Sequence, residues 1–152
     1  MTDRSAFTDD EWRALTEAPL RITLALVAAG EHGPISVVKE AAASARAIAR
    51  PSQHGPADAL ITEVAKEAES REARHDVKAH HGRSVDQIVD DALTELAPVA
   101  AALGKLSPGE VTQVRAWLLD IAAAVAAAAK SVTPAEQAVI DRINSTLQTP
   151  AG

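Results

Sequence analysis

The chain has 152 residues, of which 47% are hydrophobic and 24% are charged, a balance typical of one folded globular domain rather than of a disordered segment. Its net charge of −6 disfavours a surface for nucleic acid or anionic lipid, because both bind clustered Lys and Arg. It has no cysteine, which excludes disulfides, thiolate catalysis and cysteine-based metal sites. The first residues lack the basic-then-apolar pattern of a signal peptide, and we expect a cytoplasmic protein.

Helical structure is indicated by the make-up of the hydrophobic residues. Alanine dominates them and aromatic residues are only 2% of the chain, whereas strands favour β-branched and aromatic residues. No run alternates apolar and polar residues with period two, so no strand is predicted. The two most apolar runs, 20–29 and 117–129, each carry a charge and fall short of the roughly 20 residues of a membrane span. We therefore interpret both as buried helices.

The first two predicted helices lie between Thr8 and Gly30. Thr8 and Glu11 have the spacing of a capping box, in which each side chain bonds a backbone N–H of the other residue, and they open a short helix that carries Trp12. Pro19 suits the first turn of a helix, so we predict a second helix from Pro19 to about Gly30.

A third helix is predicted after the break at residues 33–34. Ser36 can cap it, and the residue before Pro51 ends it, because proline disfavours the helical region for its predecessor. Residues 51–56 then form a loop. The buried face of this helix is predicted from helical spacing to contain Val37, Val38, Ala41, Ala45 and Ile48.

The fourth helix begins near residues 56–58, and its apolar pattern changes phase. Its first stripe consists of Leu60, Ile61, Val64, Ala65 and Ala68, and an offset stripe consists of Ala73, Val77, His80 and His81. A straight helix cannot bury both stripes on one side. We therefore predict a break or bend near residues 69–71 and an end of the second piece at Gly82.

Three more capping boxes predict the remaining helix starts, at Ser84–Gln87, Ser107–Glu110 and Thr133–Glu136. Pro98 is expected to kink or split the helix that follows Ser84, and Gly104 to end it in the left-handed conformation.

The helix from Ser107 to about Lys130 has the clearest pattern. A packing seam of 3-4-3-4-3 spacing contains Val111, Val114, Leu118, Ile121, Val125 and Ala128. The opposite face consists almost entirely of small residues, namely Gln113, Ala116, Asp120, Ala123 and Ala127. Such a face fits a central helix with neighbours on two sides, or a flat surface for a second copy; we favour the central position.

The predicted fold is all-α: a compact bundle of about six helices without β-sheet. We expect a single domain over residues 1–152, with an ordered core of about residues 8–147. The helices Pro19–Gly30 and Pro108–Lys130 are expected to be innermost.

Parts of the chain look familiar. The segments Phe7–Trp12, Ala116–Ala122, Val125–Ala126, Ala128–Lys130 and Pro134–Ile143 resemble those of a group of small, uncharacterised bacterial helical proteins. The resemblance implies a bacterial cytosolic helical protein of unassigned activity. Because its motifs consist of core and capping residues, it carries over no functional residue.

A metal site is the first candidate for chemistry. Glu72 and His75 place a carboxylate and an imidazole on one helical face, as in carboxylate-bridged di-iron bundles, and His80 and His81 follow closely. Such a bundle needs a second Glu-x-x-His on a facing helix, and the sequence has none. The alternative is that Glu72 and His75 are solvated and that His80 or His81 completes an apolar stripe.

Asp86, Asp90 and Asp91 form an acidic patch that could bind a divalent cation or act as an acid–base pair. A solvated helix face also tolerates such a patch at a small cost. Trp12 and Trp117 are expected to anchor the core rather than to stack on bases, since no basic residues interleave with them.

None of these patterns commits the chain to an enzymatic reaction or to a cofactor. The favoured hypothesis is a non-enzymatic interaction module whose partner is another protein or a second copy of the chain. The alternative is a metal- or small-molecule-binding bundle that uses Glu72, His75, His80 and His81. We expect neither nucleic acid nor a membrane as partner.

Overall fold

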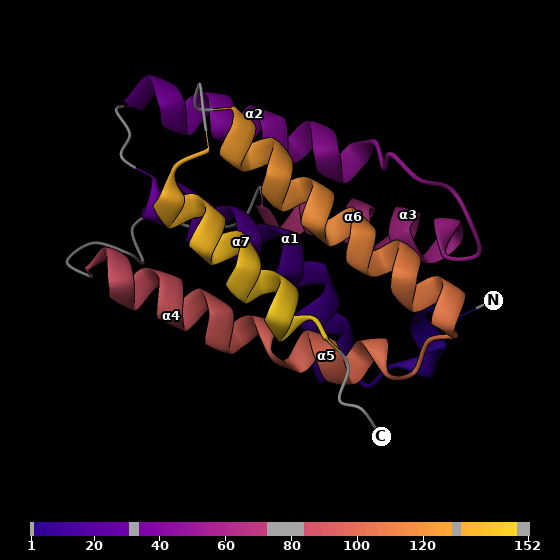
Figure 1. Cartoon of the computed structure of the whole chain (residues 1–152). Helices are drawn as coiled ribbons and strands as arrows, with labels where there is room; N and C mark the ends of the chain where they lie inside the picture. The colour runs from indigo at the N-terminus through magenta and orange to yellow at the C-terminus, as the bar shows by residue number, and fades with distance from the viewer. Residues whose placement is uncertain (1, 31–33, 73–83, 129–131, 149–152) are drawn as a thin grey trace.

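The computed structural model describes residues 2–30, 34–72, 84–128 and 132–148, and these residues form helices and no strand. The predicted all-α fold is therefore confirmed (Figure 1). The elements in chain order are the 3-10 turn η1 (Arg4–Ala6) and the α-helices α1 (Asp9–Ala29), α2 (Pro34–Ala49), α3 (Asp58–Glu72), α4 (Val85–Leu96), α5 (Pro98–Leu103), α6 (Pro108–Ala127) and α7 (Pro134–Thr146).

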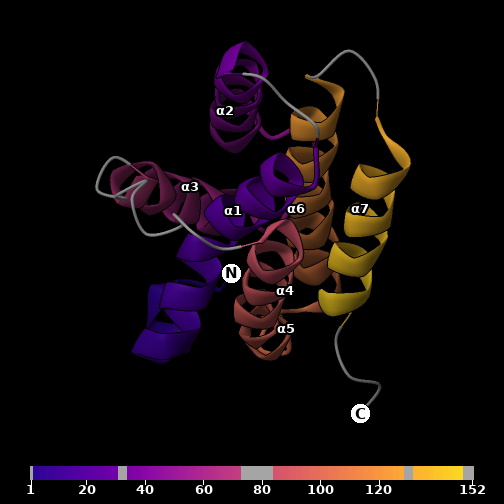
Figure 2. The same cartoon turned by 90° about the vertical axis from the view of Figure 1, so that its left-hand side faces the viewer.

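Helix α1 is the centre of the arrangement, because it contacts each of the helices α2 to α7. Figure 2 shows the later part of α1 among the other helices, with α2 and α4 on opposite sides of it. Helix α6 packs against α1, α2 and α7, so it has the neighbours on more than one side that were predicted, but Ala123 and Ala127 of its small-residue face are exposed rather than covered. Helix α2 lies at the outside of the bundle and runs beside α6 (Figure 1).

Local capping chemistry sets the helix starts. In every predicted box the Ser or Thr side chain accepts the backbone N–H three residues on, and the Glu or Gln side chain accepts the N–H of the cap. The four boxes are Thr8–Glu11, Ser84–Gln87, Ser107–Glu110 and Thr133–Glu136.

The prediction of two helices between Thr8 and Gly30 is wrong, because α1 is continuous and contains Pro19. Proline removes one helical hydrogen bond and costs about 3 kcal/mol inside a helix. Buried side chains on both sides of Pro19, including Leu15 and Ile22, offset this cost by packing against the surrounding helices. Tertiary packing thus overrides the local preference of proline for a helix start.

The predicted start of α2 is also wrong, and of its predicted face Ile48 is buried as expected but Val38, Ala41 and Ala45 are not. The helix begins at Pro34, so Ser36 lies inside it rather than at its cap. Val38 is 68% exposed, and Ala41 and Ala45 are exposed as well. The face that packs against the bundle instead contains Glu40, Ala43, Ser44, Ala47 and Ile48. The polar residues Glu40 and Ser44 lie in this face, so it does not look apolar in the sequence. Alanine also occupies both sides of the helix, so the apolar periodicity is ambiguous.

Two smaller expectations differ from the structure. Helix α3 continues through residues 69–71, the predicted position of a break or bend, and ends one residue later at Glu72; the second stripe and Gly82 lie outside the described residues. Gly104 ends α5 with φ −62° and ψ −15°, which is right-handed, so its predicted left-handed conformation is wrong. The predicted split at Pro98 is confirmed by the boundary between α4 and α5.

One gap in the apolar core is too narrow for water. A narrow gap between α1, α3 and α6 has no room for a water molecule. Its lining is apolar throughout and consists of Leu15, Leu60, Ile61, Val64, Val114, Trp117 and Leu118. This gap therefore offers no place for a ligand.

Candidate functional site

The predicted metal ligands lie outside the described residues. Glu72 is the last residue of α3 and its side chain is not described, and His75, His80 and His81 follow it in the segment 73–83. Within the described ranges, no three His, Asp or Glu side chains are grouped so that they could hold a metal ion. The Glu72 and histidine site stays a prediction.

The acidic patch on α4 faces solvent. Asp86, Asp90 and Asp91 are all exposed, and Asp90 forms an ion pair with Arg142 of α7 at 2.9 Å. Exposed pairs of this kind contribute at most about 1 kcal/mol. The geometry of a solvated helix face suffices to explain these residues.

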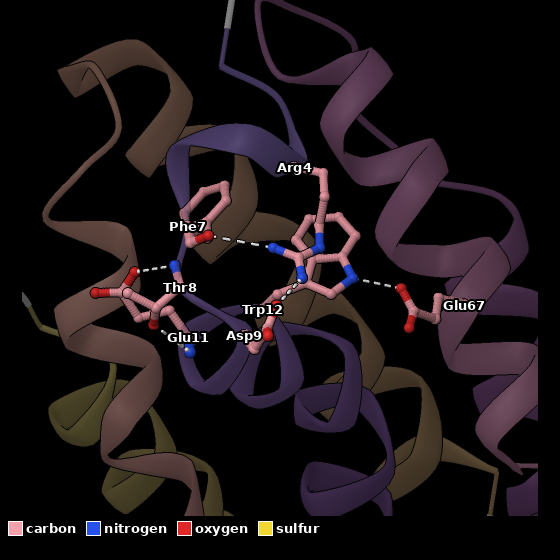
Figure 3. Close-up of polar contacts among 7 residues, drawn as sticks. All are labelled: Arg4, Phe7, Thr8, Asp9, Glu11, Trp12 and Glu67. Carbon is pink, nitrogen blue, oxygen red and sulfur yellow. Dashed lines mark hydrogen bonds and ion pairs between the residues drawn. The ribbon is translucent and has the colours of Figure 1, made fainter.

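Trp12 occupies the junction between the N-terminal segment and α3 (Figure 3). It is 4% exposed, and its indole N–H donates to Glu67 of α3. The Arg4 guanidinium lies 5.2 Å from the centre of the indole ring and also bonds Asp9 and the Phe7 carbonyl oxygen. The expected role of Trp12 as a core anchor is confirmed. Trp117 is likewise buried, at 3% exposure.

Glu110 ties the start of the chain to α6. Its carboxylate accepts hydrogen bonds from the backbone N–H and hydroxyl of Thr2, at 3.2 and 2.9 Å, and from the N–H of its cap, Ser107. Burial alone would raise the pKa of Glu110. The hydrogen bonds from Ser107 and Thr2 outweigh burial and hold the pKa below its ordinary value of 4.5.

This arrangement predicts a pH dependence of stability that Glu110→Gln removes. Since the pKa of Glu110 is lower in the folded chain, its contribution is complete above about pH 4.5 and is lost as the pH falls through the folded pKa. We expect the free energy of unfolding of wild type to exceed that of Glu110→Gln by about 1 kcal/mol at neutral pH. Urea unfolding at several pH values measures the difference, which should shrink below about pH 4.5. A difference that stays constant into acid would contradict this assignment.

The outward face of α2 carries an apolar seam. Val38, Ala42, Ala45 and Ala49 are all exposed and follow a 4-3-4 spacing, which is the spacing of a coiled-coil contact line. This line lies opposite the buried face of α2, because Glu40, Ala43, Ser44 and Ala47 occupy the other side. Alanine at such positions allows a second helix to approach closely.

A stripe of positive charge borders the seam. Lys39, Arg46 and Arg50 are spaced i, i+7 and i+11, so they line up along one side of the helix. None of them takes part in an ion pair among the described residues. Between residues 38 and 49, the one acidic side chain of α2 is Glu40, which is fully buried. The exposed charge of this face is therefore positive on a chain whose net charge is −6.

The stripe also flanks a groove between α2 and α6. Arg46 and Arg50 lie at the groove, whose apolar lining consists of Ala43, Ala47, Ala124, Ala127 and Ala128. It is open to solvent and has a volume of about 490 Å³. The seam, the cationic stripe and this groove together are called the α2 surface below. Part of the small-residue face predicted for the helix from Ser107 to Lys130 lies here.

Sequence reasoning missed the α2 surface because it assigned Val38, Ala41 and Ala45 to the core. The available signal was the sign of the charges. Lys39, Arg46 and Arg50 share one side of the helix without an acidic neighbour at i±4, whereas a solvated face usually mixes both signs.

Comparisons with models of known families, with curated proteins and with solved structures gave no match to this chain. Of what the resemblance to small bacterial helical proteins implied, the all-helical fold is observed. In the described residues, no helix is both long and apolar enough to span a membrane.

Proposed function

We propose that the chain is a protein-interaction module that docks an acidic amphipathic helix of a different protein on its α2 surface. The observation that carries the proposal is the exposed seam of Val38, Ala42, Ala45 and Ala49, whose exposed charged neighbours in the described part of α2 are the cations Lys39 and Arg46. An apolar line at coiled-coil spacing favours a helix as occupant, and charge complementarity favours acidic residues beside that helix's own apolar line.

The flanking charges argue against a second copy as occupant. In coiled-coil terms Lys39 and Arg46 both occupy position e, next to the seam. An antiparallel pair of α2 helices would bring Lys39 of one copy close to Arg46 of the other, and like charges repel. A parallel pair would place Arg46 of one copy beside Ala41 of the other, which gives no ion pair. An acidic helix of a different protein can pack its apolar line on the seam and also form ion pairs with the stripe.

A designed peptide tests this proposal. The probe is a helical peptide of three heptads with Ala and Leu along its apolar line and Glu beside it; a second peptide carries Lys in place of Glu. We expect the Glu peptide to bind, as followed by fluorescence anisotropy, and binding to weaken as salt rises. The Lys peptide should not bind.

Matched variants locate the binding face. Arg46→Glu and Ala45→Glu should each weaken binding by about tenfold or more, because they reverse the stripe and block the seam. Arg13→Glu on α1 and Ala101→Glu on α5 introduce the same changes at exposed positions elsewhere and should leave binding unchanged. Failure of the Glu peptide to bind, or equal loss in the matched controls, would refute the proposal.

A further inference from the structure

A second hollow lies on the other side of α2, between its C-terminal end and α3. Its floor is formed by Ile48 of α2 and by Ile61 and Ala65 of α3, which are 2%, 2% and 8% exposed, and Ala49 and Pro51 also line it. Its volume is about 260 Å³. The floor is fully apolar. Binding of an aliphatic group there would therefore remove apolar surface from water on both the group and the floor.

The rim of this hollow carries one charge of each sign. Lys66 and Glu69 are exposed residues of α3, three positions apart, and both border the hollow. Residues at this spacing often pair on a helix, yet neither takes part in an ion pair among the described residues. Thr62 is also at the rim, but its hydroxyl already donates to the Asp58 carbonyl oxygen at 2.8 Å.

We propose that this hollow binds a free amino acid with a branched aliphatic side chain. The side chain would rest on Ile48, Ile61 and Ala65, while Lys66 would bind the carboxylate and Glu69 the ammonium group. The opposite charges above an apolar floor complement such a zwitterion. The volume suits one small aliphatic group, because sites for larger organic ligands typically range from about 300 to 1,000 Å³. Ala49 borders both this hollow and the seam, but the residues proposed to bind the amino acid are not part of the α2 surface, so this inference does not rest on the docking proposed there.

Three small molecules distinguish the zwitterion from its halves. L-leucine carries both charges, 4-methylpentanoate only the carboxylate, and 3-methylbutylamine only the ammonium group. Titration of each into 15N-labelled protein should give shifts centred on residues 48–51 and 61–69. We expect leucine to bind most tightly, with a Kd of about 1 mM, and each half to bind more weakly.

Two variants assign the charges. Lys66→Ala should weaken the binding of leucine and of 4-methylpentanoate by about tenfold and leave the binding of 3-methylbutylamine unchanged. Glu69→Gln should weaken the binding of leucine and of 3-methylbutylamine and leave the binding of 4-methylpentanoate unchanged. Both residues are exposed, so circular dichroism should report an unaltered fold. An absence of shifts with leucine at tens of millimolar would overturn the proposal, as would leucine binding that neither variant weakens.

Discussion

Leu118→Ala should lower the free energy of unfolding by about 3 to 4 kcal/mol. Leu118 is fully buried in α6 and lines the apolar gap together with Leu15 of α1 and Ile61 of α3. The substitution removes the apolar contacts of three carbons and enlarges a gap whose walls belong to three different helices. Those walls cannot collapse without breaking their other contacts, so the cavity penalty adds to the lost burial.

The control for this prediction is the neighbouring residue. Leu119 is partly buried at the edge of the core, and Leu119→Ala should cost about 1 kcal/mol. Urea unfolding followed by circular dichroism measures both losses without reliance on Trp117, which adjoins the gap. For a chain of this size a loss of 3 kcal/mol corresponds to a fall in Tm of roughly 6 to 12 °C. Equal losses in the two variants would show that α6 does not occupy the position described.

Helix starts could be predicted from sequence because their cause is local. A capping box needs only two side chains three residues apart, such as Ser107 and Glu110, and these bond each other's backbone whatever surrounds them. The buried face of α3 could be predicted for a related reason, since Leu60, Ile61 and Val64 differ sharply in size and polarity from the residues opposite.

The face of α2 could not be predicted because its residues do not differ enough. Alanine occupies both the buried position 43 and the exposed position 45, so apolar periodicity carries little information. Glu40 and Ser44 are buried, against the usual preference of polar residues for solvent. The continuity of α1 through Pro19 escaped prediction for a comparable reason, since it depends on packing against helices that are distant in the sequence.

The α2 surface could therefore be recognised only from the fold. Once the buried face is known, the remaining side of the helix is fixed, and Lys39, Arg46 and Arg50 can be recognised as one stripe beside an exposed seam. The hollow beneath Lys66 likewise exists only because the end of α2 lies against α3. The charges were visible in the sequence; their apolar surroundings were not.

Gln113→Leu should cost about 2 kcal/mol, although leucine is the more apolar residue at a position that is 5% exposed. The Gln113 amide oxygen accepts the backbone N–H of Ala57 at 2.7 Å, and its amide nitrogen donates to the Asp58 carboxylate at 2.6 Å. Leucine would leave the N–H of the fully buried Ala57 without an acceptor. The free-energy cost of leaving this buried hydrogen bond unmade exceeds the gain from the additional apolar surface that leucine buries.

Gln113→Glu separates the hydrogen bond from the charge. The carboxylate could still accept from Ala57, but its second oxygen would face Asp58. Asp58 stays ionised, because the N–H of Gly55 bonds its carboxylate and holds its pKa below 3.8. The adjacent like charge should raise the pKa of the new carboxyl group, so this variant should lose stability relative to wild type as the pH rises from about 4 to about 7.

Gly55 supplies an independent check of the same contact. A Cβ atom at Gly55 would lie 2.8 Å from the Gln113 amide oxygen, closer than such atoms approach, so Gly55→Ala must displace the Gln113 side chain. In wild type we expect this substitution to cost about 1 kcal/mol, because both Gln113 bonds are disturbed. In the Gln113→Ala background the obstructing amide is absent, and Gly55→Ala should cost almost nothing. The double-mutant cycle, measured by urea unfolding, should therefore give a coupling of about 1 kcal/mol; additive losses would show that Gln113 does not pack against the loop at Gly55.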